Sequence, residues 1–212
     1  AADLRGIALA GGFDAPVCIV PTAAAADNNH ERAGSNGKRW FQQLGARNTR
    51  VIPLLDRSSA ADVAISTELR NARLIYMLGG FPGYLARSLY RTPAWKAMLT
   101  AFRRGALIAG SSAGAMVLCS HFFDPGKGQL SPGLGLLQRS CVLPHHNRFG
   151  SHWVERLRGQ LPHHTLIGID EETALLTEAE EGRWRVWGAG GVTLYRRGRV
   201  ESYRTDAIVH LI

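Results

Sequence analysis

The fold is decided by residues 73–116, "RLIYMLGGFPGYLARSLYRTPAWKAMLTAFRRGALIAGSSAGAM". The stretch starts with an apolar run that ends in two glycines, which is typical of a buried strand. Residues 83–105 then show helical spacing with a proline interruption, and residues 106–110 are again apolar and strand-like. This strand–helix–strand order predicts parallel strands joined by helices.

The same alternation extends toward the N-terminus. Strand-like runs cover residues 16–21 and 49–55, and helical spacing covers residues 37–46 and 62–72. We therefore expect an α/β fold: a single catalytic domain over residues 1–212, built as a three-layer sandwich around a mostly parallel central sheet. After Gly133 the strands become shorter. We expect them to complete the same sheet and to add an antiparallel edge near the C-terminus.

Composition narrows the class of protein. The formal net charge is +8, but the arginines are scattered and no nucleic-acid-binding motif accompanies them, so we predict no nucleic-acid partner. No apolar run is long enough for a membrane helix, and the first residues lack the regions of a signal peptide, which favours a cytoplasmic protein without a membrane partner. The cysteines lack metal-ligand spacing and are expected to be buried free thiols: Cys18, Cys119 and Cys141.

Two adjacent serines follow the second strand of the opening stretch. Gly110, Ser112 and Gly114 fit the pattern Gly-x-Ser-x-Gly, in which small neighbours let a strand-to-helix turn tighten until the middle serine projects above the sheet. Ser112 is thus the candidate nucleophile, and Ser111 is expected to form hydrogen bonds. The backbone amide of Ala113 could donate to an oxyanion formed on attack. A serine that merely caps the following helix would need the same residue type.

A nucleophilic serine needs a base, and His145 is the best-placed histidine. It follows the apolar run "SCVLP", so it should lie at the carboxyl end of a strand, with His146 as its immediate rival. No carboxylate or cysteine stands at a recognised ligand spacing from the histidines. The sequence therefore predicts neither a metal site nor a cofactor.

Several ordered motifs resemble one enzyme family. "AGSSAGAM" resembles the signature of the serine peptidases that include cyanophycinase and the aspartyl dipeptidase called peptidase E. Further segments agree in order: "PTAAA", "RLIYMLGG", "GLGLL", "LPHH", "GIDEETALL" and "VWGAGGVTLY". The resemblance implies a fold like that of class I glutamine amidotransferases and a serine peptidase, cyanophycinase-like or dipeptidase-like, acting on a small peptide. It also suggests a homodimer.

The resemblance carries over onto particular residues. It implies Ser112 as nucleophile, His145 as general base and Asp124 as the third member of the triad, because the family has an acidic residue between the serine and the histidine and only Asp124 stands there in this chain. Glu171 or Glu172 is the reserve candidate. The oxyanion hole would combine the amide of Ala113 with that of Gly80, where a double glycine lets the backbone approach a substrate.

The expected substrate-binding residues include departures from the family. They are Gly79, Phe81, Ser111, Arg148 and Arg156. Cyanophycinases have an acid or amide after the double glycine and several arginines after the catalytic histidine, whereas this chain has Phe81 there and Phe149 and Ser151 where arginine would be expected. Arg148 and Arg156 could pair with a substrate carboxylate. The natural substrate stays open.

Two other classes of function are compatible with the same residues. A general serine esterase or amidase of the α/β-hydrolase type shares the Gly-x-Ser-x-Gly turn, although its "HGGG" oxyanion motif is missing here. A noncatalytic relative could retain the pocket without turnover. The leading hypothesis is an exopeptidase that cleaves a peptide or isopeptide bond in a small or acidic peptide through an acyl-enzyme.

Overall fold

The computed structural model describes residues 2–177 and 182–211 of the chain. The α-helices of this part are α1 (Ala2–Leu9), α2 (His30–Gln43), α3 (Val63–Asn71), α4 (Pro82–Leu89), α5 (Pro93–Arg103), α6 (Ala113–Leu118) and α7 (Val154–Gln160). Short 3-10 helices are η1 (Thr22–Asp27), η2 (Ser59–Ala61) and η3 (Gly150–Trp153). The strands are β1 (Val17–Val20), β2 (Thr49–Val51), β3 (Leu74–Met77), β4 (Leu107–Gly110), β5 (His121–Asp124), β6 (Gln129–Pro132), β7 (Ser140–Leu143), β8 (Thr165–Ile169), β9 (Thr173–Thr177), β10 (Arg183–Gly188), β11 (Gly191–Arg196), β12 (Arg199–Arg204) and β13 (Ile208–His210).

The N-terminal half of the chain contains a four-stranded parallel sheet with the strand order β2-β1-β3-β4. Its register pairs Leu74 with both Val17 and Leu107. The opening stretch of sequence thus supplies the adjacent strands β3 and β4 with helices between them, and the predicted α/β class with a parallel sheet is confirmed. The predicted proline interruption is the boundary between two helices: Pro93 is the first residue of α5, and the Thr92 side chain caps it by accepting from the Trp95 amide.

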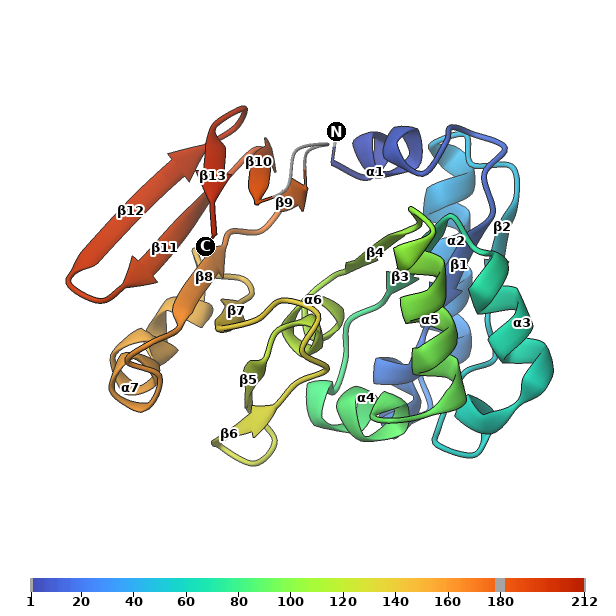
Figure 1. The fold of residues 1–212 in the computed structure, drawn as a ribbon, viewed down its shortest axis with the longest axis horizontal. Coiled ribbons are helices and arrows are strands. Elements are labelled where there is room, and N and C mark those ends of the chain that lie inside the picture. The colour runs from blue at the N-terminus through green and yellow to red at the C-terminus, as the bar shows by residue number, and fades with distance from the viewer. Residues whose placement is uncertain (1, 178–181, 212) are drawn as a thin grey trace.

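Helices cover both faces of this sheet (Figure 1). Side chains that alternate along the strands separate into two buried clusters, as the period of two requires. Ile75 and Ile108 pack with residues of α3, α4, α5 and α6, whereas Ile19 and Leu74 pack with residues of α1 and α2. The carboxyl ends of β3 and β4 therefore lie between two helical layers.

The later strands differ from the prediction that they complete the same sheet. In the described residues they form separate ladders, β12-β11-β8-β7, β13-β10-β9 and β5-β6, and only β7 and β8 pair in parallel among them. The chain leaves β4 through the turn at residues 110–112 and enters α6, and the next strands pair with each other instead of with β4. Side-chain packing is nevertheless continuous, because Ile108, Ile167 and Val192 belong to one buried cluster.

Figure 1 shows β11 and β12 on the side of the molecule opposite α3, with α4, β5 and β6 between these two regions along its lower edge. No helix in residues 2–177 and 182–211 has the length and apolar character needed to span a bilayer.

Candidate active site

Ser112 lies at a sharp turn between β4 and α6. Its backbone has φ 48° and ψ −113°, outside the conformations that a residue with a side chain normally adopts. The turn needs glycine on both sides of the serine, because the backbone there leaves no room for a Cβ atom. A Cβ atom on Gly110 would lie 2.4 Å from the Gly114 carbonyl carbon, and a Cβ atom on Gly114 would lie 2.2 Å from the Met77 oxygen. The turn thus holds the serine in a strained conformation at the carboxyl end of the sheet.

The Ser112 side chain does not cap the helix that it precedes. No capping hydrogen bond joins it to α6, and its Oγ lies 3.2 Å from His145 Nε2 instead. A hydroxyl at this distance from an imidazole nitrogen can pass its proton to that nitrogen as the oxygen attacks. This geometry is the one that a serine nucleophile and a histidine base require.

The parallel pairing of β7 and β8 brings His145 and Glu171 together. Leu143, the last residue of β7, is paired with Gly168, so the segments that follow the two strands leave the sheet at the same edge. His145 and Glu171 both lie on these segments, and His145 Nδ1 is 3.1 Å from Glu171 Oε1. An ionised carboxylate only accepts hydrogen bonds, so Nδ1 carries the proton and the lone pair of Nε2 faces Ser112.

Glu171 is itself held on two further sides. Arg148 Nε lies 2.6 Å from its Oε2, and its backbone amide donates to Asn147 Oδ1 at 3.0 Å. Hydrogen bonding from His145 is the largest cause that lowers the pKa of the Glu171 carboxyl, and the positive charge of Arg148 adds to it. The carboxylate is therefore kept ionised and oriented toward the imidazole.

Asp124, the carboxylate expected to complete the triad, lies elsewhere. It is buried at the end of β5, where its Oδ1 accepts from the Gly126 amide and its Oδ2 lies against Gly83 in the first turn of α4. The position beside His145 Nδ1 is taken by Glu171, the reserve candidate. Glu172 is exposed, and its backbone oxygen accepts from the Ala189 amide. Position in the chain misled the prediction, because the carboxylate that reaches the histidine comes after it.

The double glycine lies beside the serine, as an oxyanion hole requires. A Cβ on Gly79 would be 3.3 Å from Ser112 Cβ, and one on Gly80, whose φ is +139°, would be 2.4 Å from the Ala23 oxygen. Within the described residues, the amides of Gly80 and Ala113 donate to no protein acceptor. Both remain available to an oxyanion.

The expected substrate-binding residues are only partly free to meet a substrate. Phe81 is 47% exposed directly after the double glycine, while its amide donates to the Ala23 oxygen. Burial raises the pKa of Tyr76 to about 12, and the nearby Ser111 side chain opposes part of that rise. Arg156 donates to the Gly128 oxygen at 2.6 Å.

His146, the rival base, belongs to a second network beside the first. Its Nε2 lies 2.8 Å from the Tyr195 hydroxyl, and its Nδ1 lies 3.4 Å from Asp170 Oδ1. Asp170 also accepts from the Gly191 amide through Oδ2. Sequence reasoning missed this network and the contact of Asn147 with Glu171, although the adjacency of these residues to His145 and Glu171 was a usable signal.

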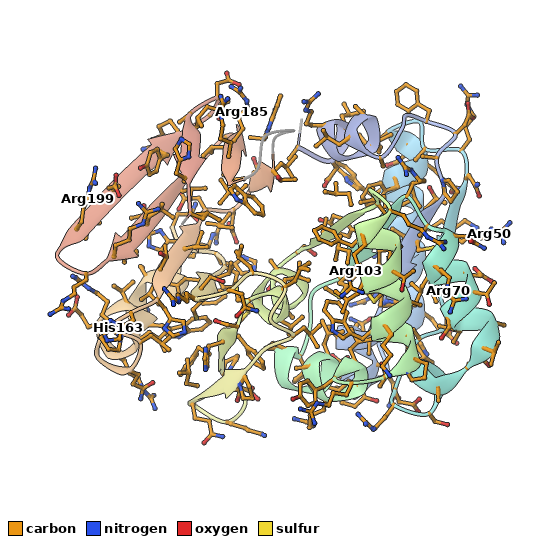
Figure 2. All side chains as sticks on the ribbon, in the orientation of Figure 1. Arg50, Arg70, Arg103, His163, Arg185 and Arg199 are labelled. Atoms are coloured by element: carbon orange, nitrogen blue, oxygen red, sulfur yellow. The ribbon has the colours of Figure 1, made fainter. Side chains whose placement is uncertain are left out.

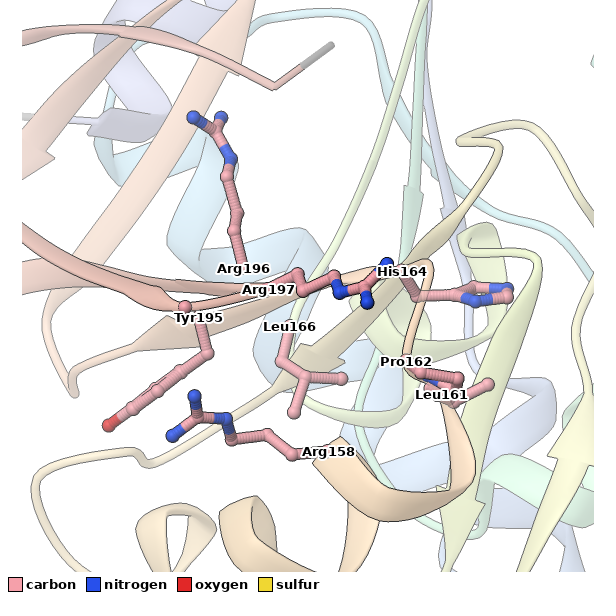
Figure 3. Close-up of a pocket in the computed structure, with 9 residues that line it drawn as sticks. Arg158, Leu161, Pro162, His164, Leu166, Tyr195, Arg196 and Arg197 are labelled. Carbon is pink, nitrogen blue, oxygen red and sulfur yellow. The ribbon is translucent and has the colours of Figure 1, made fainter.

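Two surface pockets lie apart from these residues. The smaller, of about 160 Å³, is shown in Figure 3 and is lined by Arg158, Leu161, Pro162, His164, Leu166, Tyr195, Arg196, Arg197 and Gly198. The larger, of about 500 Å³, contains Gly83 and Asp124 in its wall. Neither includes Ser112 or His145 in its lining. Within the described part of the chain, no three His, Cys, Asp or Glu side chains form a group that could hold a metal ion.

Arginine side chains occur on both halves of the molecule. Figure 2 shows Arg50 and Arg70 on the half of the molecule opposite Arg185 and Arg199. Arginines thus occur on both halves, but the net charge is uneven: the formal charge is +7 over residues 1–106 and +1 over residues 107–212.

Comparison with known proteins identifies the family. A cyanophycinase of Geminocystis herdmanii is 30% identical over 208 residues, which cover 92% of this chain and 74% of that protein. A cyanophycinase of Nostoc is 29% identical over 87% of this chain and 64% of that protein. The crystal structure of a peptidase from an acI-B1 Actinobacterium superposes with a TM-score of 0.79 at 28% identity, covering 99% of this chain and 89% of that one. The sequence profile of peptidase family S51 matches residues 7–184. The chain therefore belongs to peptidase family S51 and is a serine-type peptidase.

Proposed function

We propose that this peptidase hydrolyses a peptide or isopeptide bond in a small peptide through an acyl-enzyme on Ser112, with His145 as general base and Glu171 as the orienting carboxylate. The observation that carries the proposal is the continuous contact from Ser112 Oγ to His145 Nε2 at 3.2 Å and from His145 Nδ1 to Glu171 at 3.1 Å. Nucleophile, base and orienting group are each within reach of the next.

Acylation begins when Ser112 Oγ attacks the substrate carbonyl carbon. As the Oγ–C bond forms, the hydroxyl proton passes to His145 Nε2, and the carbonyl oxygen becomes an oxyanion held by the amides of Gly80 and Ala113. Glu171 stabilises the imidazolium that results. The C–N bond then breaks, and the leaving nitrogen takes the proton from Nε2.

Deacylation uses water as the second nucleophile. His145 takes a proton from the water as its oxygen attacks the acyl carbon, and the same amides hold the second oxyanion. The Oγ–C bond breaks, the acid product leaves, and the proton on Nε2 returns to Ser112 Oγ. Atoms balance as one water consumed for each bond cleaved, and the sequence of steps is complete without a cofactor.

A dipeptide panel read by mass spectrometry tests this function. The panel varies the acyl residue, includes α- and β-linked aspartyl peptides because the family resemblance implies an acidic preference, and adds simple esters. Hydrolysis should disappear in Ser112→Ala and His145→Ala and persist in Ser58→Ala, the matched control at an exposed serine whose side chain forms no capping hydrogen bond. Equal hydrolysis by wild type and Ser112→Ala would refute the assignment, and hydrolysis of esters without any peptide would favour a general esterase.

A further inference from the structure

An exposed aromatic ring lies on the catalytic base. The Phe149 ring stacks on the His145 imidazole with centroids 5.0 Å apart and planes inclined by 28°. Phe149 is four residues beyond the histidine, and its side chain is 45% exposed. A solvent-facing apolar surface therefore adjoins the group that moves the proton.

This ring is supported from behind by further aromatic side chains. Trp153, at the end of η3, lies 5.6 Å from Phe149 between ring centroids, and Phe123 of β5 lies 4.8 Å from Trp153. Phe123 is buried. A row of contacts with a buried end restricts the movement of Phe149, so its outer face is a preformed surface.

The two arginines expected to meet a substrate carboxylate are engaged with protein groups instead. Arg148 forms an ion pair with Glu171 at 2.6 Å. Arg156 lies over the Phe123 ring, with its guanidinium carbon 5.4 Å from the ring centroid, and donates to the Gly128 oxygen. The side of the site next to His145 therefore presents an aromatic ring, while the nearby cations already have partners.

The path of the proton indicates which part of the substrate lies next to the Phe149 ring. The leaving nitrogen takes its proton from His145 Nε2, so the residue that carries this nitrogen must pass beside the imidazole. Phe149 covers one face of that imidazole. The side chain of the leaving residue is the part of a small peptide that comes within reach of Phe149.

We propose that Phe149 forms a subsite for the leaving residue and that the enzyme prefers an aromatic or large aliphatic side chain there over an acidic one. This inference rests on the proposed function. Packing an aromatic side chain on the exposed face of Phe149 removes apolar surface of both rings from water and adds a ring–ring contact, which together favour it over alanine by about tenfold in kcat/KM. An aspartate as the leaving residue would bury little apolar surface and form no ring–ring contact, and its carboxylate would lose hydration.

The test varies the leaving residue while the acyl residue is kept at the best one found in the dipeptide panel. Peptides ending in Phe, Leu, Ala, Asp and Arg are compared by kcat/KM in wild type, Phe149→Ala and Phe149→Leu. Phe102→Ala is the matched control, because Phe102 is a comparably exposed phenylalanine, at 43%, on α5. We expect the Phe-over-Ala ratio to be about tenfold in wild type and Phe102→Ala, to fall to about one in Phe149→Ala, and to be partly retained in Phe149→Leu.

The Phe-over-Ala ratio of kcat/KM shows whether Phe149 recognises the leaving residue or only supports the histidine. If Phe149 only held the imidazole in place, Phe149→Ala would lower the rate for every peptide equally and leave the ratio unchanged, which would overturn the inference. Cleavage with a preference for an aspartate leaving residue would also overturn it, and the proposed function would stand. A panel in which no peptide is cleaved would overturn both.

Discussion

Replacing Glu171 by glutamine should disable the enzyme, whereas replacing Asp124 by asparagine should not. Glutamine keeps the size of the side chain but removes the negative charge that faces His145 Nδ1 at 3.1 Å, so the imidazolium formed during acylation loses its counter-ion. Removing the orienting carboxylate of such a triad lowers kcat by about 10⁴-fold where that carboxylate is buried. The Glu171 side chain is 34% exposed, so water replaces part of its effect, and we expect kcat to fall by about 10³-fold.

Asp124→Asn is the matched control for this substitution. Asp124 Oδ1 accepts a hydrogen bond from the Gly126 amide, and an asparagine oxygen can accept the same bond. The negative charge that is lost lies beside the first turn of α4, where it contributes ~0.5 kcal/mol to stability. We expect kcat within about threefold of wild type. Both variants are assayed for kcat/KM on the best peptide and for thermal unfolding. A Glu171→Gln enzyme with near-wild-type kcat, together with a large loss in Asp124→Asn, would refute the placement of Glu171 in the triad.

Three further predictions concern the surroundings of the triad. Gly80→Ala should lower kcat by about 10²–10³-fold in steady-state assays, because the new Cβ would collide with the Ala23 oxygen and displace an oxyanion donor; unchanged kcat would contradict that role. Arg148→Ala should lower kcat only about two- to fivefold, since exposed ion pairs contribute ~0.2–1 kcal/mol, and Arg148→Lys should lose less. Finally, the pKa of Glu171 is lowered on folding from its ordinary 4.5, so its contribution to stability is present above about pH 4.5 and is lost as the pH falls through the folded-state pKa. Thermal unfolding measured from pH 7 to about pH 3 should show that the difference in stability between wild type and Glu171→Gln shrinks as the pH falls. A difference in stability that does not change with pH would contradict this prediction.

The strand-to-helix turn was predictable because its determinants are local. Gly110, Ser112 and Gly114 are neighbours in sequence and also in space, so the spacing of small residues already carries the steric requirement. His145 was predictable for a related reason: a residue that follows an apolar strand lies at the carboxyl end of a sheet. Parallel strand order in the N-terminal half followed from the alternation of short apolar runs and helical segments.

The carboxylate that lies beside His145 was not predictable in the same way. His145 and Glu171 are 26 positions apart and meet only because β7 and β8 pair in parallel with Leu143 opposite Gly168. The register of a strand pair depends on side-chain packing across the whole sheet, which one sequence does not reveal. The later strands were misplaced for the same reason, since their apolar pattern indicates strands without saying which neighbours they choose. The contact of Phe149 with His145 was not predictable either, because the path of a loop decides which side chains its residues contact.

The most direct test of the account is the site of labelling by a fluorophosphonate, which reacts with serines activated by a neighbouring base. Intact mass spectrometry should show a single adduct on the wild-type protein, and fragmentation of the labelled peptide should place it on Ser112. Ser111→Ala should label at the wild-type rate, Ser112→Ala should not label, and Glu171→Gln should label much more slowly. An adduct on Ser111 or elsewhere, or equal labelling of wild type and Ser112→Ala, would contradict the claim that Ser112 is the nucleophile.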